Sequence, residues 1–135
     1  MNNIHILLAE VVASLWKLAA EENEPLLLGL GVIDRTLEKF QTNLPEPLNT
    51  ELAFSATSVG LRCLDWPEAE LYLQESMLAE IDGSTFTKMR IRMDDDDAVQ
   101  FLLSVGLSSS QRFSLAAIFY GLVKAEMTML EENGG

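Results

Sequence analysis

The strongest constraint on the fold of this chain is a helix start signal in the middle of the sequence. Asp65 can cap a helix, Pro67 fits the first turn of that helix, and Glu68 stands three residues after the cap. Small residues precede this signal and apolar residues follow it, which is typical of two helices that pack closely. We therefore predict a helix at 49–64 and a second helix at 66–81, folded together as a hairpin.

Apolar residues recur at helical spacing over most of the remaining sequence. Pro25 suits the first turn of a helix, and Pro45 and Pro47 end that helix because neither proline can donate a backbone hydrogen bond. Gly106 is a typical helix stop. The remaining predicted helices are 4–20, 25–40, 98–105 and 108–131.

One segment, 85–93, departs from helical spacing. Met89, Ile91 and Met93 alternate there with basic residues, which is the period of a strand. A lone strand has no pairing partner in a helical chain, so the segment is either a short strand or an irregular loop. If it is extended, it could pair with a strand of another protein or of a second copy.

The predicted fold class is therefore mainly all-α. We expect helical hairpins in an orthogonal or repeat-like bundle, with one short strand at 85–93 as an open alternative to a loop. At 135 residues the chain is long enough for one domain, so we expect a single helical domain over 1–135.

Composition and charge limit the classes of function. Hydrophobic residues make up 48% of the chain and charged residues 22%, as in an ordinary globular protein. The 21 acidic and 9 basic residues give a net charge of −12, which repels nucleic acid and favours basic partners. We expect no membrane span at 4–20, because Glu10 and Lys17 interrupt that apolar run. A single cysteine, Cys63, fits a reducing compartment, so we expect a cytoplasmic protein.

Side chains that could carry catalysis or bind a metal are few. His5 is the only histidine, and Cys63 falls on the predicted buried face of a helix. The aspartates at 94–97 lack the alternating ligands and central glycine of a calcium loop, so we interpret them as the acidic start of a helix. We therefore predict no enzyme activity, no cofactor and no metal.

The predicted hairpin resembles a tetratricopeptide repeat. Trp66, Ala69 and Leu73 match the second helix of that family, and Ala56 is suitably small for the first helix. The chain departs from the family at three positions: at Gly60 an aromatic residue is usual, at Ala53 a tryptophan is common, and at Ile81 a closing proline is typical. The resemblance implies a helical adaptor that binds another protein.

The chain is also similar to the small acidic chaperones of bacterial type III secretion systems. The similarity rests on the stretch 6–11 in the first predicted helix, on the size and acidity of the chain, and on its final amphipathic helix. It implies a cytoplasmic protein whose groove holds the apolar helix of an export substrate and stops it from polymerising early.

The leading hypothesis is thus a non-enzymatic protein-binding module, a small acidic chaperone or adaptor that holds an apolar or amphipathic helix of a partner. The alternative is an acidic inhibitor, such as an immunity or anti-defence protein, that mimics charge on a basic site. A regulatory subunit or cryptic enzyme comes third, and a homodimer stays open. For each predicted groove residue, ordinary core packing is the competing interpretation. The predicted groove residues are Leu52, Ala56, Leu73, Met77, Phe113, Tyr120 and Met127.

Overall fold

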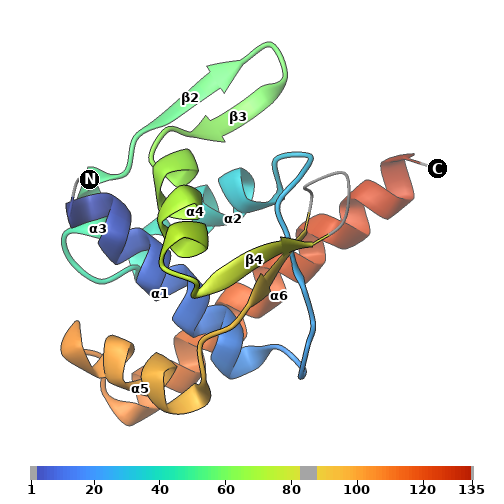
Figure 1. Ribbon diagram of the computed structural model, residues 1–135. Helices are drawn as coiled ribbons and strands as arrows, with labels where there is room; N and C mark the ends of the chain where they lie inside the picture. The colour runs from blue at the N-terminus through green and yellow to red at the C-terminus, as the bar shows by residue number, and fades with distance from the viewer. Residues whose placement is uncertain (1–2, 83–87, 135) are drawn as a thin grey trace.

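The computed structural model describes residues 3–82 and 88–134 (Figure 1). The helices are α1 (Asn3–Ala19), α2 (Val32–Phe40), the short 3-10 helix η1 (Gln41–Asn43), α3 (Leu48–Glu51), α4 (Trp66–Glu75), α5 (Asp95–Ser104) and α6 (Ser109–Gly134). The strands are β1 (Leu26–Leu27), β2 (Phe54–Thr57), β3 (Gly60–Cys63), β4 (Ala79–Asp82) and β5 (Lys88–Ile91). The mainly helical fold that the sequence predicts is confirmed, and small antiparallel sheets accompany the helices.

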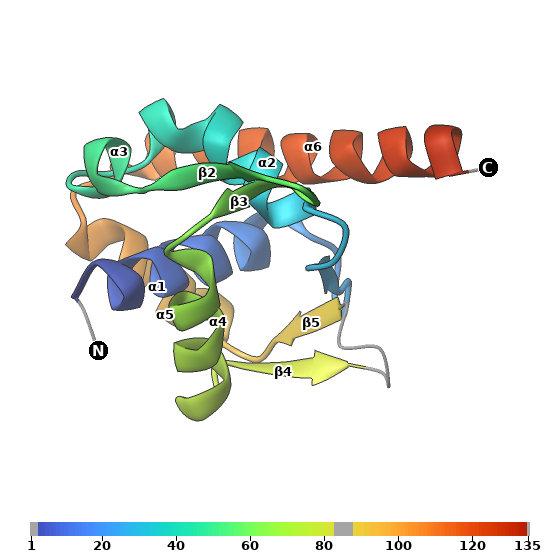
Figure 2. The ribbon, with the colours of Figure 1, turned by 90° about the horizontal axis from the view of Figure 1, so that it is seen from above.

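Helix α1 is the central element, with α4, α5 and α6 packed around it (Figures 1 and 2). All of its residues from Leu8 to Trp16 are buried except Glu10. A helix with apolar residues on all sides is stable only when neighbouring elements cover all of them. The predicted helix at 4–20 is confirmed, and it forms the centre of the core.

Strand β5 is the middle strand of a three-stranded antiparallel sheet with the order β1-β5-β4. Met89 of β5 is fully buried and lies opposite Leu26 on one side and Ile81 on the other. The predicted strand is therefore confirmed over 88–91, and the expectation that it lacks a partner is wrong. Residues 85–87 of that prediction lie outside the described residues, and residues 92–93 lie beyond the end of β5.

The predicted helix at 49–64 is wrong. Only α3 is helical there, and the chain then forms the antiparallel hairpin β2–β3, which extends from the body beside α2 (Figure 1). Gly60 turns the hairpin with a φ of 112°, a conformation that glycine adopts without strain. The hairpin is fixed to α2 because Asp34 Oδ1 accepts a 2.7 Å hydrogen bond from the backbone amide of Cys63. The predicted hairpin of two helices is therefore a β-hairpin followed by one helix.

Helix α4 begins where the sequence predicts but ends at Glu75. Met77 has a left-handed φ of 63°, which ends the helix before the chain enters β4. Asp65 occupies the N-cap position but makes no side-chain capping bond. Its carboxylate instead accepts a 2.8 Å bond from the backbone amide of Ala53 and pairs with His5 Nε2 at 3.0 Å. Asp65 therefore joins the base of the hairpin to α1.

The other predicted helices have mixed outcomes. The first half of the helix predicted at 25–40 is β1 and a turn, because Leu30 and Gly31 have φ values of 59° and 75°. The helices predicted at 98–105 and 108–131 are confirmed as α5 and α6. Asp94 caps α5 by accepting a 2.8 Å bond from the amide of Asp97.

Candidate functional site

Helix α6 is the longest described element, and it is covered on one side only. It begins at a reciprocal cap in which the amide of Gln111 donates to Ser108 Oγ and the Gln111 side chain accepts from the amide of Ser108. The inner face packs on α1 and α2 through Ala116, Phe119 and Val123. In both overall views its C-terminal turns extend beyond the other helices and strands (Figures 1 and 2).

A buried ion-pair cluster holds the inner face of α6 to α2. The carboxylate of Glu126 is 2% exposed and accepts hydrogen bonds from Arg35 Nε at 2.8 Å and from Lys39 Nζ at 2.6 Å. Burial by itself would raise the pKa of Glu126, but the two cations outweigh burial and leave the pKa below its ordinary value. The carboxylate is therefore ionised at neutral pH.

A second polar cluster joins α6 to the loop that follows α1. The carboxylate of Glu24 accepts hydrogen bonds from the Tyr120 hydroxyl at 2.9 Å and from Lys124 Nζ at 3.0 Å. The ring of Tyr120 stacks on Trp16 with centroids 5.2 Å apart, and Trp16 Nε1 donates to the backbone carbonyl of Glu24. The bond to Glu24, with burial adding to it, raises the pKa of Tyr120. Tyr120, a predicted groove residue, therefore joins α6 to the body of the protein.

The opposite side of α6, which we call the outer face, is exposed and uncharged. Phe113, Ile118 and Met129 are 56%, 44% and 50% exposed there. Between Arg112 and Glu131 the only charged residues are Lys124 and Glu126, and both pair with the body. The residues of the outer face are Phe113, Ser114, Ala117, Ile118, Gly121, Ala125, Thr128 and Met129, all exposed.

The stretch Ser109–Glu132 of α6 is also long and apolar enough to cross a membrane, by length and composition alone. Core helices of water-soluble proteins pass the same test, but they are mostly buried, whereas 22% of the apolar window in α6 is buried. The charged residues of the middle of α6 pair with α2 and Glu24, and apolar or small residues occupy the outer face.

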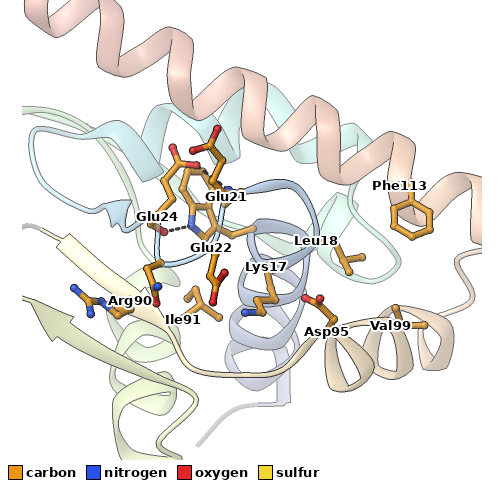
Figure 3. A pocket seen from close by; sticks show the side chains of 13 residues that line it. Lys17, Leu18, Glu21, Glu22, Glu24, Arg90, Ile91, Asp95, Val99 and Phe113 are labelled. Atoms are coloured by element: carbon orange, nitrogen blue, oxygen red, sulfur yellow. Dashed lines mark hydrogen bonds between the residues drawn. The ribbon is translucent and has the colours of Figure 1, made fainter.

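A cleft of about 580 Å³ lies beside the start of α6, lined by residues of α1, of the loop 20–24 that follows it, of β5 and of α5, and by Phe113 of α6 (Figure 3). Phe113, Leu18 and Val99 lie at one end of it, and Glu22 and Glu24 lie toward the other. Charged residues of both signs line the cleft, since Lys17 and Arg90 lie there together with the carboxylates. Phe113 lines this cleft and also belongs to the outer face of α6.

The structure does not bring the predicted groove residues to one surface. Leu52 and Leu73 lie in the core, where they are 7% and 0% exposed. For these two residues the competing interpretation, ordinary core packing, is confirmed. Ala56 is exposed on β2, and Met77 is 81% exposed after α4. The remaining three residues lie on α6: Phe113 is exposed, Met127 is half-buried, and Tyr120 forms the cluster with Glu24.

The residues examined for catalysis have structural partners. Cys63 is buried, and burial raises the pKa of its thiol to about 11, so the thiol stays protonated at neutral pH. His5 pairs with Asp65. In the part of the chain that the structure describes, no group of three or more histidine, cysteine, aspartate or glutamate side chains is placed to hold a metal ion.

Sequence reasoning missed most of the outer face. Ala117, Gly121 and Ala125 follow one another at intervals of four residues, and this spacing was visible in the sequence. Which side of the helix would stay uncovered was not visible, because that depends on the positions of α1 and α2.

No protein family, no curated protein and no solved structure matches this chain.

Proposed function

We propose that this protein is a non-enzymatic protein-binding module whose outer face of α6 binds the apolar side of another helix. One observation carries the proposal. Phe113, Ile118 and Met129 are exposed on a face without any charged side chain, in a chain whose net charge is −12. Soluble proteins rarely leave such a continuous apolar surface without a partner.

The way α6 is held supports this role. The clusters at Glu24 and Glu126 fix the helix on its inner side, so the outer face needs no ordering before a partner binds. A straight helix face of this kind recognises a partner helix through apolar contacts repeated every three or four residues. Binding should therefore depend little on salt.

A small acidic chaperone of the type III secretion kind is one concrete form of this proposal. Such a chaperone would act in the cytoplasm, where Cys63 stays a free thiol, and would cover the apolar helix of a substrate. The repeat-like bundle implied by the tetratricopeptide resemblance is not required for this mode of binding. Only α6 would need to stay helical, and in this fold it is.

Charge mimicry is the second candidate function, and one observation favours it. The four aspartates Asp94, Asp95, Asp96 and Asp97 are all exposed at the start of α5, and Asp95 also lines the cleft beside α6. A basic site on a target protein could bind this surface. Such binding would weaken steeply as salt rises, because exposed charges are screened beyond about 10 Å at 0.1 M salt.

The test uses a fluorescent amphipathic helix built from alanine, leucine and glutamine, with a scrambled peptide of the same composition. Ile118→Glu places a charge on the outer face, and Leu71→Glu is the matched control, because both residues are 44% exposed on helices. We expect Ile118→Glu to weaken binding by about 10-fold or more, Leu71→Glu to leave it unchanged, and salt to have little effect. Equal losses in both variants would contradict the proposal, as would equal binding of the scrambled peptide.

A further inference from the structure

A second cleft, of about 410 Å³, lies at the start of α4, between that helix, α2 and β3. We call it the α4 cleft. None of the described residues that line it belongs to the outer face of α6. The apolar part of its wall consists of the buried Leu28 and the exposed Leu64 and Pro67. The charged and aromatic residues that line it are Asp34, Arg62, Trp66 and Glu70.

Glu70 is a half-buried carboxylate in the α4 cleft that no cation neutralises. Among the described residues, no basic side chain pairs with it. Asp34, by contrast, accepts a 2.7 Å hydrogen bond from the amide of Cys63 and pairs with Arg62 at 3.4 Å. Two carboxylates and one guanidinium leave the cleft with one unit of net negative charge, which a cationic group of a ligand would balance.

The indole N–H of Trp66 is a buried donor with no well-placed acceptor. Trp66 is 5% exposed, and its Nε1 makes no hydrogen bond of ordinary geometry within the described residues. It lies near the Glu70 carboxylate, one helical turn further along α4. A buried donor without an acceptor is costly, so an acceptor on a ligand would bind there favourably. The cleft therefore presents a donor and an anionic acceptor side by side.

We propose that the α4 cleft binds the amino-terminal residue of a peptide or protein. The α-ammonium group donates to the Glu70 carboxylate, and the first carbonyl oxygen accepts from Trp66 Nε1. These two ligand groups lie on either side of one Cα atom, so they match a protein donor and acceptor that are neighbours. Capture of an amino-terminal amine is a recurring mode of peptide recognition. The site goes beyond the proposed function, because it involves no residue of α6.

The electrostatics of the cleft agree with a cationic ligand. Burial raises the pKa of Glu70, and the negative charge of Asp34 adds to this effect, while the nearby Trp66 N–H lowers the pKa by less. The ionised form of Glu70 is thus held at a cost that a bound ammonium group would remove. The net charge of −12 also draws cations toward the chain.

Two related ligands fit the cleft less well. A lysine side chain would balance the charge of Glu70, but it carries no carbonyl beside its ammonium group, so the Trp66 N–H would keep no acceptor. A free amino acid is a zwitterion without net charge, so it leaves the negative charge of the cleft unbalanced. An amino-terminal residue within a peptide supplies both the cation and the acceptor.

Nuclear magnetic resonance of the ¹⁵N-labelled full chain tests the inference with leucyl-alanine amide as the probe. The chain contains two tryptophans, so two indole N–H signals report on binding, and sequential assignment identifies them. We expect the Trp66 signal to shift and to saturate in the millimolar range, as is usual for a ligand of this size. The signal of Trp16, which is 1% exposed and does not line the cleft, should stay unchanged. A Trp66 signal that stays unchanged at about 20 mM peptide would overturn the inference.

Three related compounds identify the ligand group. Acetyl-leucyl-alanine amide lacks the ammonium group and should bind at least about 10-fold more weakly. Acetyl-lysyl-alanine amide carries its cation on the side chain only and should bind equally weakly, as should free leucine. If either of these two compounds bound as tightly as leucyl-alanine amide, the cleft would belong to a basic side chain or to a free amino acid, and the inference would be wrong.

Matched variants locate the binding site. Glu70→Gln should weaken binding of leucyl-alanine amide by about 10-fold or more, because a neutral amide cannot balance an ammonium group. Glu68→Gln removes the same charge from an exposed position of α4 and should leave binding unchanged. Equal losses in both variants would overturn the inference, since only the net charge of the chain would then attract the peptide. Ile118→Glu should not affect this binding, so the α4 cleft and the outer face of α6 can fail independently.

Discussion

Helices α1 and α6 are both rich in apolar residues, yet the fold covers α1 on all sides and α6 on one side only. Leu8 and Trp16 of α1 are 0% and 1% exposed, whereas Phe113 and Met129 of α6 are 56% and 50% exposed. Helices α4, α5 and α6 surround α1, while α6 itself packs on α1 and α2 along its inner face. Similar apolar content therefore leads to opposite exposure, decided by the neighbouring elements.

Helix α6 packs an apolar inner face on the core, but its outer face differs from that of an ordinary surface helix. Such a helix places apolar residues toward the core and charged residues toward water. In α6 the charged Glu126 is buried in an ion-pair cluster, while apolar and small residues occupy the outer face. We infer that α6 lacks a packing partner on its outer face in the isolated chain, whereas neighbouring elements cover α1 on all sides.

The largest expected difference between the two helices is in the free energy of unfolding. Leu15→Ala in α1 should destabilise the protein by about 3 to 4 kcal/mol, because it opens a cavity at a residue that is 1% exposed. Ile118→Ala on the outer face of α6 should change stability by less than about 0.5 kcal/mol in the monomer. Urea denaturation of dilute protein measures both. Equal losses would show that the outer face is covered within one chain.

The next effect concerns the ion-pair cluster that holds α6. The double variant Arg35→Met with Lys39→Met leaves the buried carboxylate of Glu126 without a cation, which should cost about 2 to 3 kcal/mol. Adding Glu126→Gln to the double variant should recover part of this loss, since a neutral amide is cheaper to bury than a carboxylate. Urea denaturation of the three chains tests the coupling. A double variant as stable as the wild type would mean that the cluster does not hold α6.

A smaller, pH-dependent effect comes from the same carboxylate. Because the two cations lower the pKa of Glu126 in the folded state, its ionisation stabilises the protein above pH 4.5, the ordinary value for a glutamate. This contribution is lost as the pH falls from 4.5 through the lower folded pKa. The stability difference between the wild type and Glu126→Gln should therefore shrink below pH 4.5. Thermal unfolding across this range measures it, and Glu131→Gln on the exposed end of α6 controls for the change in net charge.

The sequence predicts the local elements of this fold better than the distant contacts. The cap at Asp94 and the apolar spacing of residues 4–20 depend only on near neighbours, and both α5 and α1 are confirmed. The helix predicted at 49–64 is wrong because small residues fit a close helix crossing and a hairpin equally well. The hydrogen bond that fixes the β-hairpin joins the Cys63 amide to the Asp34 carboxylate, and these two residues lie 29 positions apart in the sequence.

The candidate site, too, could be predicted from the sequence only in part. Phe113 and Met127 lie on α6, as predicted, but Leu73 belongs to the core and Tyr120 to an inner cluster. An apolar periodic pattern identifies a helix and not which of its sides stays open. The four-residue spacing around Gly121 was readable, although its meaning depends on knowing that this side faces solvent.

The smallest expected effect concerns Gly121→Ala, which tests whether the outer face of α6 is uncovered at its middle. Alanine favours the helical backbone, and its Cβ meets nothing within 4 Å in a single chain, so the monomer should gain roughly 0.5 to 1 kcal/mol. Thermal unfolding of dilute protein measures this gain. A loss of stability in Gly121→Ala would show that another part of the chain covers this side of α6, and the contrast with α1 would then fail.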